Sequence, residues 1–263
     1  MRKKLGLALG SGGSRGIAHI GFLKALEEAG IVPDYVTGCS MGAVVGYVYC
    51  AGVSPEEMRK KVFTLRLSSI ASLNVGKGQG LFRLTRARKQ IEEIAGDKTF
   101  DELTIPFACV ATDIDAGELV LLNEGNAIDA VLASSSIPGA FTPAKIGERR
   151  LVDGGVLERV PTEQLKAMGA EVIVAVDVLG DLTEKKVGTN IIETLLRCID
   201  VMDTRVTHLK KELRAPSIDL WLEPELGDMN QYKVKLKQMK LAYQKGYELG
   251  KANVQKIKEL IGE

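Results

Sequence analysis

The chain has 263 residues, of which 45% are hydrophobic and 26% are charged, and its formal net charge at pH 7 is +1. This composition is typical of a globular α/β domain with a sizeable core, and the near-neutral charge argues against a nucleic-acid-binding surface. The apolar run after the basic N-terminus stops at Gly10, too early for a signal peptide, and no run reaches the ~18 residues of a membrane span. We therefore expect any membrane contact to be peripheral.

Four cysteines are scattered along the sequence and form no C-x-x-C pair: Cys39, Cys50, Cys109 and Cys198. This spacing favours reduced thiols in a cytoplasmic protein over a disulfide framework or a metal site. We therefore predict a cytoplasmic location, with no metal and no cofactor.

The first predicted elements form a βαβ unit around a glycine-rich loop. Residues 5–9 are an apolar run typical of a buried strand, residues 10–16 read GSGGSRG, and the helix that follows ends at Gly30. A short extended run at residues 34–37 comes next. Such a unit implies a parallel sheet with a right-handed crossover.

Three interpretations of the glycine-rich loop are open. A dinucleotide-binding loop would need G-x-G-x-x-G, but Arg15 takes the place of the third glycine, and Asp34 precedes the second strand instead of following it. An oxyanion-binding loop needs only free backbone N–H groups near a helix N-terminus, which Gly12 and Gly13 can offer and to which Arg15 adds positive charge. In the third interpretation, glycine only allows close packing of helix and strand. The oxyanion loop is favoured.

The second strand leads into a G-x-S-x-G pattern, Gly38-Cys39-Ser40-Met41-Gly42, and a small apolar, helix-like run follows it. Between a strand and a helix, this pattern is a nucleophile elbow, a sharp turn that exposes the serine hydroxyl. Gly38 and Gly42 are needed on either side because a Cβ there would strike the neighbouring backbone. An ordinary Gly-Ser turn is the alternative, but the context favours Ser40 as a catalytic serine.

A helix over residues 56–67 is followed by a segment of different character at about residues 68–84. This segment mixes apolar residues with three glycines and has no clear period. A mobile flap over an apolar site and a surface loop packed by its own side chains are both consistent with it.

The rest of the chain alternates predicted strands and helices. The strands are expected at residues 105–113, 119–122, 150–152, 172–178 and 218–222, and the helices at 127–133, from 161, 191–213 and 232–260. Residues 115–118 are expected to form the hairpin turn before the second of these strands. The last helix has one apolar face, which favours packing on the sheet over a dimer seam. No linker interrupts the sequence, so we expect a single domain over residues 1–263.

A serine nucleophile needs a base, and the chain has only two histidines. His19 falls inside the first helix and His208 on a late charged helix, so both are expected to have surface or helix-packing roles. Asp153 is the better candidate because it ends a strand and is followed by Gly154-Gly155, which leaves its carboxylate uncrowded. An ordinary Asp-Gly turn is the alternative. An aspartate acts as a base only in a dry site that raises its pKa.

Four blocks of sequence together resemble the patatin-like phospholipase family, especially its small bacterial members. They are GSGGSRG at 10–16, GCSMG at 38–42, SSSIPG at 134–139 and DGG at 153–155. The resemblance implies a three-layer α/β/α fold with a central, mostly parallel sheet. It also implies hydrolysis of acyl esters, including phospholipids and lysophospholipids.

The resemblance places a Ser–Asp dyad on Ser40 and Asp153, and an oxyanion loop on Gly12, Gly13 and Arg15. One departure is visible, because many members read D-G-G-G where this chain reads GSGG at residues 10–13. The change leaves both glycine amides available, and it affects the geometry of the loop more than the class of reaction.

We therefore predict a serine acyl-ester hydrolase that forms an acyl-enzyme on Ser40, with Asp153 as base. Its partner is an acyl-ester or lipid substrate, no nucleic acid is expected, and the oligomeric state stays open. Two alternatives are a non-catalytic lipid- or acyl-binding module on the same fold and a nucleotide-dependent oxidoreductase, which the mismatch at Arg15 disfavours.

Overall fold

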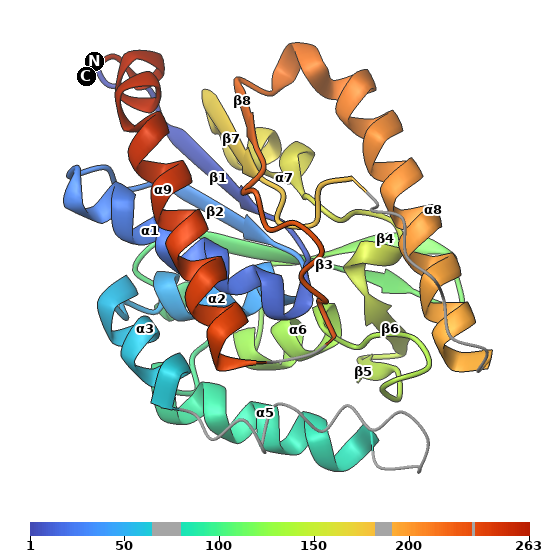
Figure 1. The fold of residues 1–263 in the computed structure, drawn as a ribbon. Helices are drawn as coiled ribbons and strands as arrows, with labels where there is room; N and C mark the ends of the chain where they lie inside the picture. Colours follow the sequence, from blue (N-terminus) through green and yellow to red (C-terminus); the bar gives the residue numbers. More distant parts are fainter. Residues whose placement is uncertain (65–79, 182–190, 233–234) are drawn as a thin grey trace.

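The computed structural model describes residues 1–64, 80–181, 191–232 and 235–263 (Figure 1). Within these residues, one eight-stranded sheet has the strand order β5-β6-β3-β2-β1-β7-β8, and β4 pairs with β3 off this path. The strands are β1 (Leu5–Leu9), β2 (Tyr35–Gly38), β3 (Phe107–Asp113), β4 (Glu118–Leu122), β5 (Ala144–Ile146), β6 (Arg149–Asp153), β7 (Val172–Val176) and β8 (Leu220–Leu222). The helices are α1 (Ile17–Glu28), α2 (Met41–Cys50), α3 (Pro55–Thr64), α5 (Gly80–Ala95), α6 (Ala127–Ser134), α7 (Thr162–Met168), α8 (Ile191–Arg214) and α9 (Leu236–Ile261).

The centre of the sheet is parallel and one side of it is antiparallel. β1 pairs in parallel with β2 and β7, β2 with β3, and β7 with β8. β4 and β6 run antiparallel to β3, and β5 antiparallel to β6. β1 and β7 are buried along their whole length, which is why both read as unbroken apolar runs. The predicted hairpin is present, because β3 and β4 pair directly on either side of a tight turn.

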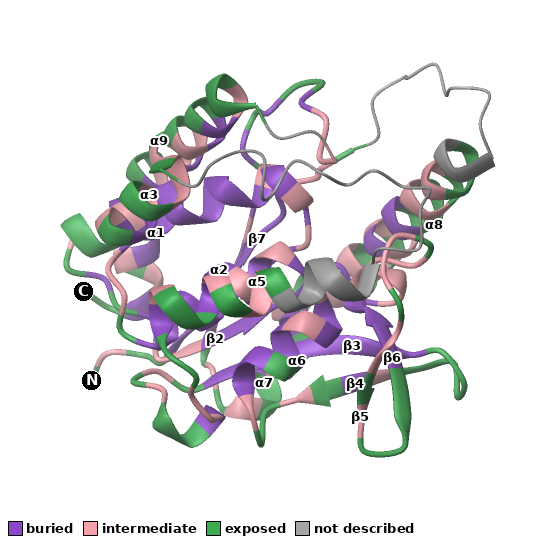
Figure 2. Cartoon of the chain, turned by 90° about the horizontal axis from the view of Figure 1, so that it is seen from below, coloured by how far each residue is buried: buried purple, intermediate pink, exposed green. Residues whose placement is uncertain are grey.

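Helices cover the two faces of the sheet, and alternate residues of each strand point to opposite faces. In β1, Leu5, Leu7 and Leu9 join the main core with α1, α2, α6 and α9, whereas Ala8 joins a smaller core that includes Leu165 of α7. Figure 2 shows the buried residues gathered in the strands and in the helix faces that cover them. The predicted α/β/α arrangement with a mostly parallel sheet is confirmed.

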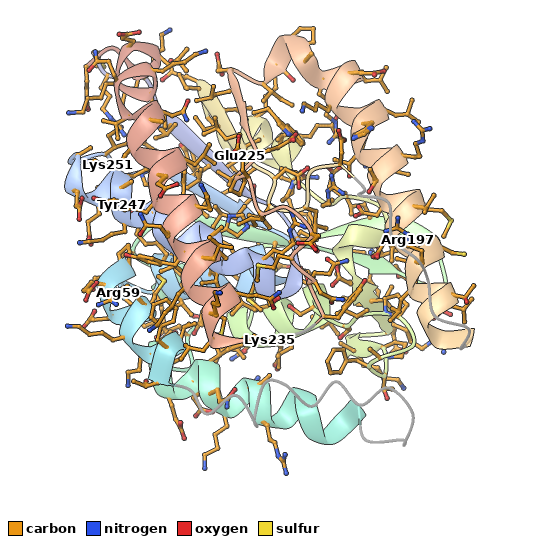
Figure 3. The ribbon with its side chains drawn as sticks, viewed as in Figure 1. Arg59, Arg197, Glu225, Lys235, Tyr247 and Lys251 are labelled. Atoms are coloured by element: carbon orange, nitrogen blue, oxygen red, sulfur yellow. The ribbon has the colours of Figure 1, made fainter. Side chains whose placement is uncertain are left out.

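α9 packs chiefly against α1, although its single apolar face favours packing on the sheet. Glycines allow the two helices to approach closely. A Cβ at Gly246 would lie 1.8 Å from the Ala18 carbonyl oxygen, and one at Gly21 would lie 2.0 Å from that of Tyr243. Farther along, the Tyr247 hydroxyl donates to Glu28 at 2.7 Å, on the side of α9 that faces α1 (Figure 3).

The two ends of the described chain lie side by side (Figure 1). The Lys3 amide donates to the Ile261 carbonyl oxygen at 2.9 Å, and Arg2 Nε lies 3.0 Å from a Glu263 carboxylate oxygen. No helix in the described part of the chain is long and apolar enough to cross a membrane. Of the segment proposed as a flap, residues up to 79 lie outside the described residues, and residues 80–84 begin α5.

Candidate active site

Ser40 occupies the sharp turn between β2 and α2. Its φ of 52° and ψ of −119° make it the only non-glycine residue with positive φ in the described ranges. A residue held in such a region costs about 1–3 kcal/mol and persists only where its surroundings fix it. Here the Cys39 amide donates to the Leu9 carbonyl oxygen at 3.1 Å, and the Ser40 amide donates to Ser134 Oγ at 2.9 Å. These bonds tie the turn to β1 and α6.

The two glycines of the elbow lie where no side chain fits. A Cβ at Gly38 would lie 2.6 Å from the backbone of Ala43, and a Cβ at Gly42 would lie 2.1 Å from the Leu9 carbonyl oxygen. Backbone atoms cannot move aside as a flexible side chain can, so α2 can start this close to β1 only with glycine at both positions.

Asp153 ends β6, and its carboxylate lies beside the elbow. The Gly155 amide donates to Oδ1 at 2.8 Å, Cys39 Sγ lies 3.7 Å from the same oxygen, and the Ser40 side chain is close enough to lower the pKa of this carboxylate. Burial raises the pKa of Asp153 from 3.8 to about 6, although the hydrogen bonds from Ser40, Gly155 and Cys39 pull the pKa downward. The structure therefore places the two predicted catalytic residues side by side.

Residues in the block at 134–139 form hydrogen bonds with the backbone of both Ser40 and Asp153. The sequence alone did not indicate this role. Ser134 Oγ accepts from the Ser40 amide, as described above. Two residues later, the Ser136 carbonyl oxygen accepts from the Asp153 amide at 2.9 Å. Both serines are buried. Polar residues directly after a predicted apolar helix were the available signal, but their partners lie far away in the chain.

The glycine-rich loop borders the same cavity as Ser40. Gly13 has a φ of 51° and starts a short 3₁₀ helix over Gly13–Gly16, and a Cβ there would lie 2.4 Å from the Gln231 carbonyl oxygen. At Gly12, a Cβ would lie 2.3 Å from a methyl carbon of Val178. With the described residues, the amides of Gly12 and Gly13 form no hydrogen bond, so both are available to a ligand.

Arg15 directs its guanidinium at the protein backbone. Its Nε donates to the Val178 carbonyl oxygen at 2.7 Å, and one terminal nitrogen donates to those of Gly227 and Met229, both at 3.3 Å. Burial lowers the pKa of Arg15 from its usual value. The side chain thus ties the glycine-rich loop to the segments that follow β7 and precede α9.

Neither histidine is placed to act as a base for the Ser40 hydroxyl, because each has another partner. His19 is fully buried in α1, its Nε2 lies 2.8 Å from the Gly10 carbonyl oxygen, and burial lowers its pKa to about 4. At this pKa the ring is neutral at pH 7 and donates from Nε2 to the glycine-rich loop. His208 lies on α8, with Nε2 2.6 Å from Asp181 Oδ1. Among the described residues, no group of three or more His, Cys, Asp or Glu side chains could hold a metal ion.

An apolar cavity of about 300 Å³ opens at Ser40. Gly13 and Ser40 lie on its wall together, so the glycine-rich loop and the serine face one space. Its apolar lining comes from α1, α2, α3, α5, α6 and α9 and includes Ile17, Val44, Val48, Met58, Ile91 and Met239. Such a cavity accepts a long apolar group with its polar end at the serine.

Comparisons with known proteins agree with this arrangement. The family model "Patatin-like phospholipase" matches residues 7–166. An uncharacterized NTE family protein of Mycobacterium tuberculosis is 35% identical over 179 residues, which cover 67% of this chain and 49% of that protein. Lysophospholipase NTE1 of Coccidioides immitis is 36% identical over 191 residues, which cover 67% of this chain and 12% of that protein. The chain thus matches about half of the mycobacterial relative and a small part of the fungal one.

Two solved structures share the fold. The crystal structure of VipD from Legionella pneumophila matches 97% of this chain and 67% of its own, with a TM-score of 0.63 and 14% identity. The type III effector protein ExoU matches 97% of this chain and 53% of its own, with a TM-score of 0.52 and 15% identity. The narrower resemblance to small bacterial members stays a prediction. The family model covers more than half of the residues, including the elbow, the glycine-rich loop and the Asp-Gly-Gly turn, so this chain belongs to the patatin-like phospholipase family.

Proposed function

We propose that this protein is a serine acyl-ester hydrolase acting on lipids with a long acyl chain, such as lysophospholipids. The observation that carries the proposal is that Ser40, in a strained turn at the wall of an apolar cavity, lies beside the buried Asp153 carboxylate and lowers its pKa. The names of the fungal relatives, which are lysophospholipases, support the same substrate class.

Acylation would use the dyad and the glycine-rich loop together. Asp153 accepts the proton of Ser40 Oγ as this oxygen attacks the ester carbonyl carbon. The amides of Gly12 and Gly13 then donate to the oxyanion, which develops next to the positive N-terminal end of the 3₁₀ helix over Gly13–Gly16 that leads into α1. When the tetrahedral intermediate collapses, Asp153 returns its proton to the departing alcohol.

Deacylation would repeat these steps with water. Asp153 removes a proton from the water molecule, the hydroxide attacks the acyl carbonyl carbon, and Ser40 leaves with the proton. A pKa of about 6 suits Asp153 for this work, because the carboxylate is ionised at pH 7 and is still a stronger base than an exposed aspartate. Arg15 supports the reaction by positioning the loop, since its guanidinium is already bound to carbonyl oxygens.

The cavity argues for an acyl chain over the two alternatives. A dinucleotide would place charged phosphates against a lining that is mainly apolar. A binding module would have no need of a serine in a strained turn beside a buried carboxylate. Both features fit a nucleophile.

The central experiment is labelling with a fluorophosphonate, which forms a covalent bond with an activated serine. The adduct is expected on Ser40, and Ser40→Ala should remove it together with ester hydrolysis. Ser134→Ala serves as the matched control, because this serine touches the elbow but should not react. An adduct on another serine, or p-nitrophenyl esters bound without release of p-nitrophenol, would contradict the proposal.

A second experiment tests the acyl cavity through Val48, which lies two turns along α2 from Ser40. This separation is about 12 Å along the helix axis. Val48→Phe should therefore leave hydrolysis of butyryl esters unchanged and reduce kcat/KM for dodecanoyl and longer esters by roughly tenfold or more. Val44→Phe, one turn nearer the serine, should slow hydrolysis of all chain lengths. If the length profile of Val48→Phe equals that of the wild type, the acyl chain does not lie along α2.

A further inference from the structure

Three charged residues of α8, Asp203, Lys210 and Arg214, face inward and pair with buried charges of the domain. Arg159, which is buried, lies 2.6 Å from Asp177 and 3.1 Å from Asp203 of α8. Glu158 is also buried and pairs with Lys210 at 2.6 Å and with Arg214 at 2.8 Å. The helix is therefore held on the molecule mainly by buried ion pairs.

The outward face of α8 is correspondingly apolar. Eleven large hydrophobic side chains are exposed in the described residues, and five of them lie on this helix: Leu195, Val201, Met202, Leu209 and Leu213. Leu195, Met202 and Leu209 are 57–59% exposed and Leu213 is 81% exposed. A concentration of this kind marks a surface that another molecule covers.

Four of these side chains belong to a heptad pattern. Leu195, Met202 and Leu209 are spaced seven residues apart. Each is followed four residues later in the sequence by a second apolar residue: Ile199, Val206 and Leu213. We call these six residues the α8 seam. Leucine or methionine occupies the d positions, and Ile199, Val206 and Leu213 occupy the a positions, so every seam position is apolar as in a coiled coil. α8 lies at one edge of the molecule, where a second helix can reach the seam (Figure 1).

We propose that the α8 seam pairs with the α8 seam of a second copy of this chain, with the two helices antiparallel. The exposed charges beside the seam give the direction. Arg205 and Glu212 both precede an a position, and neither forms an ion pair with a described residue. In an antiparallel pair, Arg205 of each copy faces Glu212 of the other. In a parallel pair, Arg205 would face Lys210, which has the same sign.

The same register also pairs the apolar residues. With Arg205 opposite Glu212, Met202 lies opposite Leu213 and Val206 lies opposite Leu209, and the two-fold axis repeats both layers. The arrangement is isologous and closes as a dimer through Met202, Val206, Leu209 and Leu213. Leu195 and Ile199 lie beyond the overlap of the two helices, because their opposite positions fall after the end of α8 at Arg214.

The first test measures self-association of the full chain by sedimentation velocity over a concentration series. The wild type is expected to dimerise, and Leu209→Glu should raise the dissociation constant on the order of 100-fold or more, because it buries a charge in the seam. Val201→Glu is the matched control. Val201 is also exposed on α8, but it lies outside the seam, so this change should leave the dimer intact. Circular dichroism checks that both variants fold, and esterase activity should be retained in both.

The second test is a charge reversal. Arg205→Glu should weaken the dimer by roughly tenfold, because two like-charge pairs replace two attractive ones, and the double change Arg205→Glu with Glu212→Arg should restore it. Raising the salt concentration should reduce both effects. A dimer that is strengthened or unaffected by Arg205→Glu would overturn the antiparallel arrangement.

A lipid surface is the other kind of partner that would cover an apolar helix face. Sedimentation with vesicles of phosphatidylcholine and phosphatidylglycerol separates the two cases. If the wild type is monomeric at all concentrations and binds these vesicles, and Leu209→Glu abolishes that binding, the seam is a membrane contact and the dimer proposal is wrong. None of these readouts depends on Ser40, so they stand apart from the proposed hydrolase activity.

Discussion

Ser40 and Asp153 are held in states that an unfolded chain would avoid. Ser40 has a strained backbone, and Asp153 keeps a carboxylate in a buried site that raises its pKa to about 6. Neighbouring residues maintain both states, with Ser134 bonded to one residue and Ser136 to the other. Active-site groups are frequently kept in this way, at the expense of stability.

The raised pKa of Asp153 predicts how activity depends on pH. Only the ionised carboxylate can accept the Ser40 proton, so kcat/KM should fall below an apparent pKa of about 6. Asp153→Asn should remove activity at every pH. The measurement is the pH–rate profile for a soluble short-chain ester. An acid limb near pH 4 would mean that the base in the free enzyme is not this carboxyl group.

The same shift predicts a pH-dependent effect on stability. The folded-state pKa of Asp153 is higher than its unfolded value of 3.8, so the folded state binds more protons between these values and loses stability as pH rises through about 6. Asp153→Asn abolishes this loss. Relative to the wild type, the variant should therefore gain about 1–1.5 kcal/mol between pH 5 and pH 8. Urea unfolding at both pH values measures the difference, and an equal effect at the two would count against the raised pKa.

His19 predicts a separate effect, on the geometry of the glycine-rich loop. His19→Phe removes the hydrogen bond to the Gly10 carbonyl oxygen, so kcat should fall by roughly 10- to 100-fold with little change in KM. His19→Gln keeps a donor and should recover most of the rate. Since the pKa of His19 is lowered to about 4, neither variant should move the limb near pH 6. If Gln and Phe reduce kcat equally, His19 contributes packing only.

Among individual residues, the sequence predicts the functional role of those whose role depends on their neighbours in the chain. Ser40 and its two glycines are recognisable because the elbow needs them within five positions, and Asp153 because two glycines follow it. Ser134, Ser136 and His19 are different, since their hydrogen-bond partners are non-local and only the fold brings them together. Arg15 lies in the predicted loop, but its carbonyl partners come from residues more than 160 positions away.

Among the elements, α1 and α9 form the closest helix pair, and the glycines between them predict a clear loss of stability. Gly246→Ala would place a methyl group 1.8 Å from the Ala18 carbonyl oxygen, so the helices would have to separate. We expect the free energy of unfolding to fall by about 2–3 kcal/mol. Lys240→Ala, at an exposed position of α9, should change it by less than about 0.5 kcal/mol. Urea unfolding of both variants gives the comparison, and a neutral Gly246→Ala would show that the helices adjust freely.

The position of α9 also shows what a periodic pattern can predict. Its apolar face predicts a covered helix, and the helix is covered, but the pattern does not say by which element. α1 already occupies the adjacent face of the sheet, and its small residues fit against those of α9. The predicted helix boundaries were close for α6 and α8, since caps and breaker residues there are local in sequence.

For the whole molecule, the sequence predicted the fold class because the βαβ unit and the apolar strands leave few arrangements. It did not predict the antiparallel side of the sheet in full. The strand expected at residues 150–152 is β6, but β5 was missed, because it has only three residues and none of them is fully buried. The apolar cavity at Ser40 was equally out of reach, because its lining comes from helices that are far apart in the chain.

Because the two ends of the described chain are adjacent, the protein should tolerate circular permutation, in which the old ends are joined and new ends are opened elsewhere. Because residues 3 and 261 are hydrogen-bonded to each other, a few added glycines could link the ends, and new ends could be opened at the exposed Gly147 turn between β5 and β6. Such a circular permutant should fold, keep a circular dichroism spectrum like that of the parent, and react with fluorophosphonate at the same serine. A permutant that aggregates would indicate that the β5–β6 hairpin must stay continuous for Asp153 to be set in place.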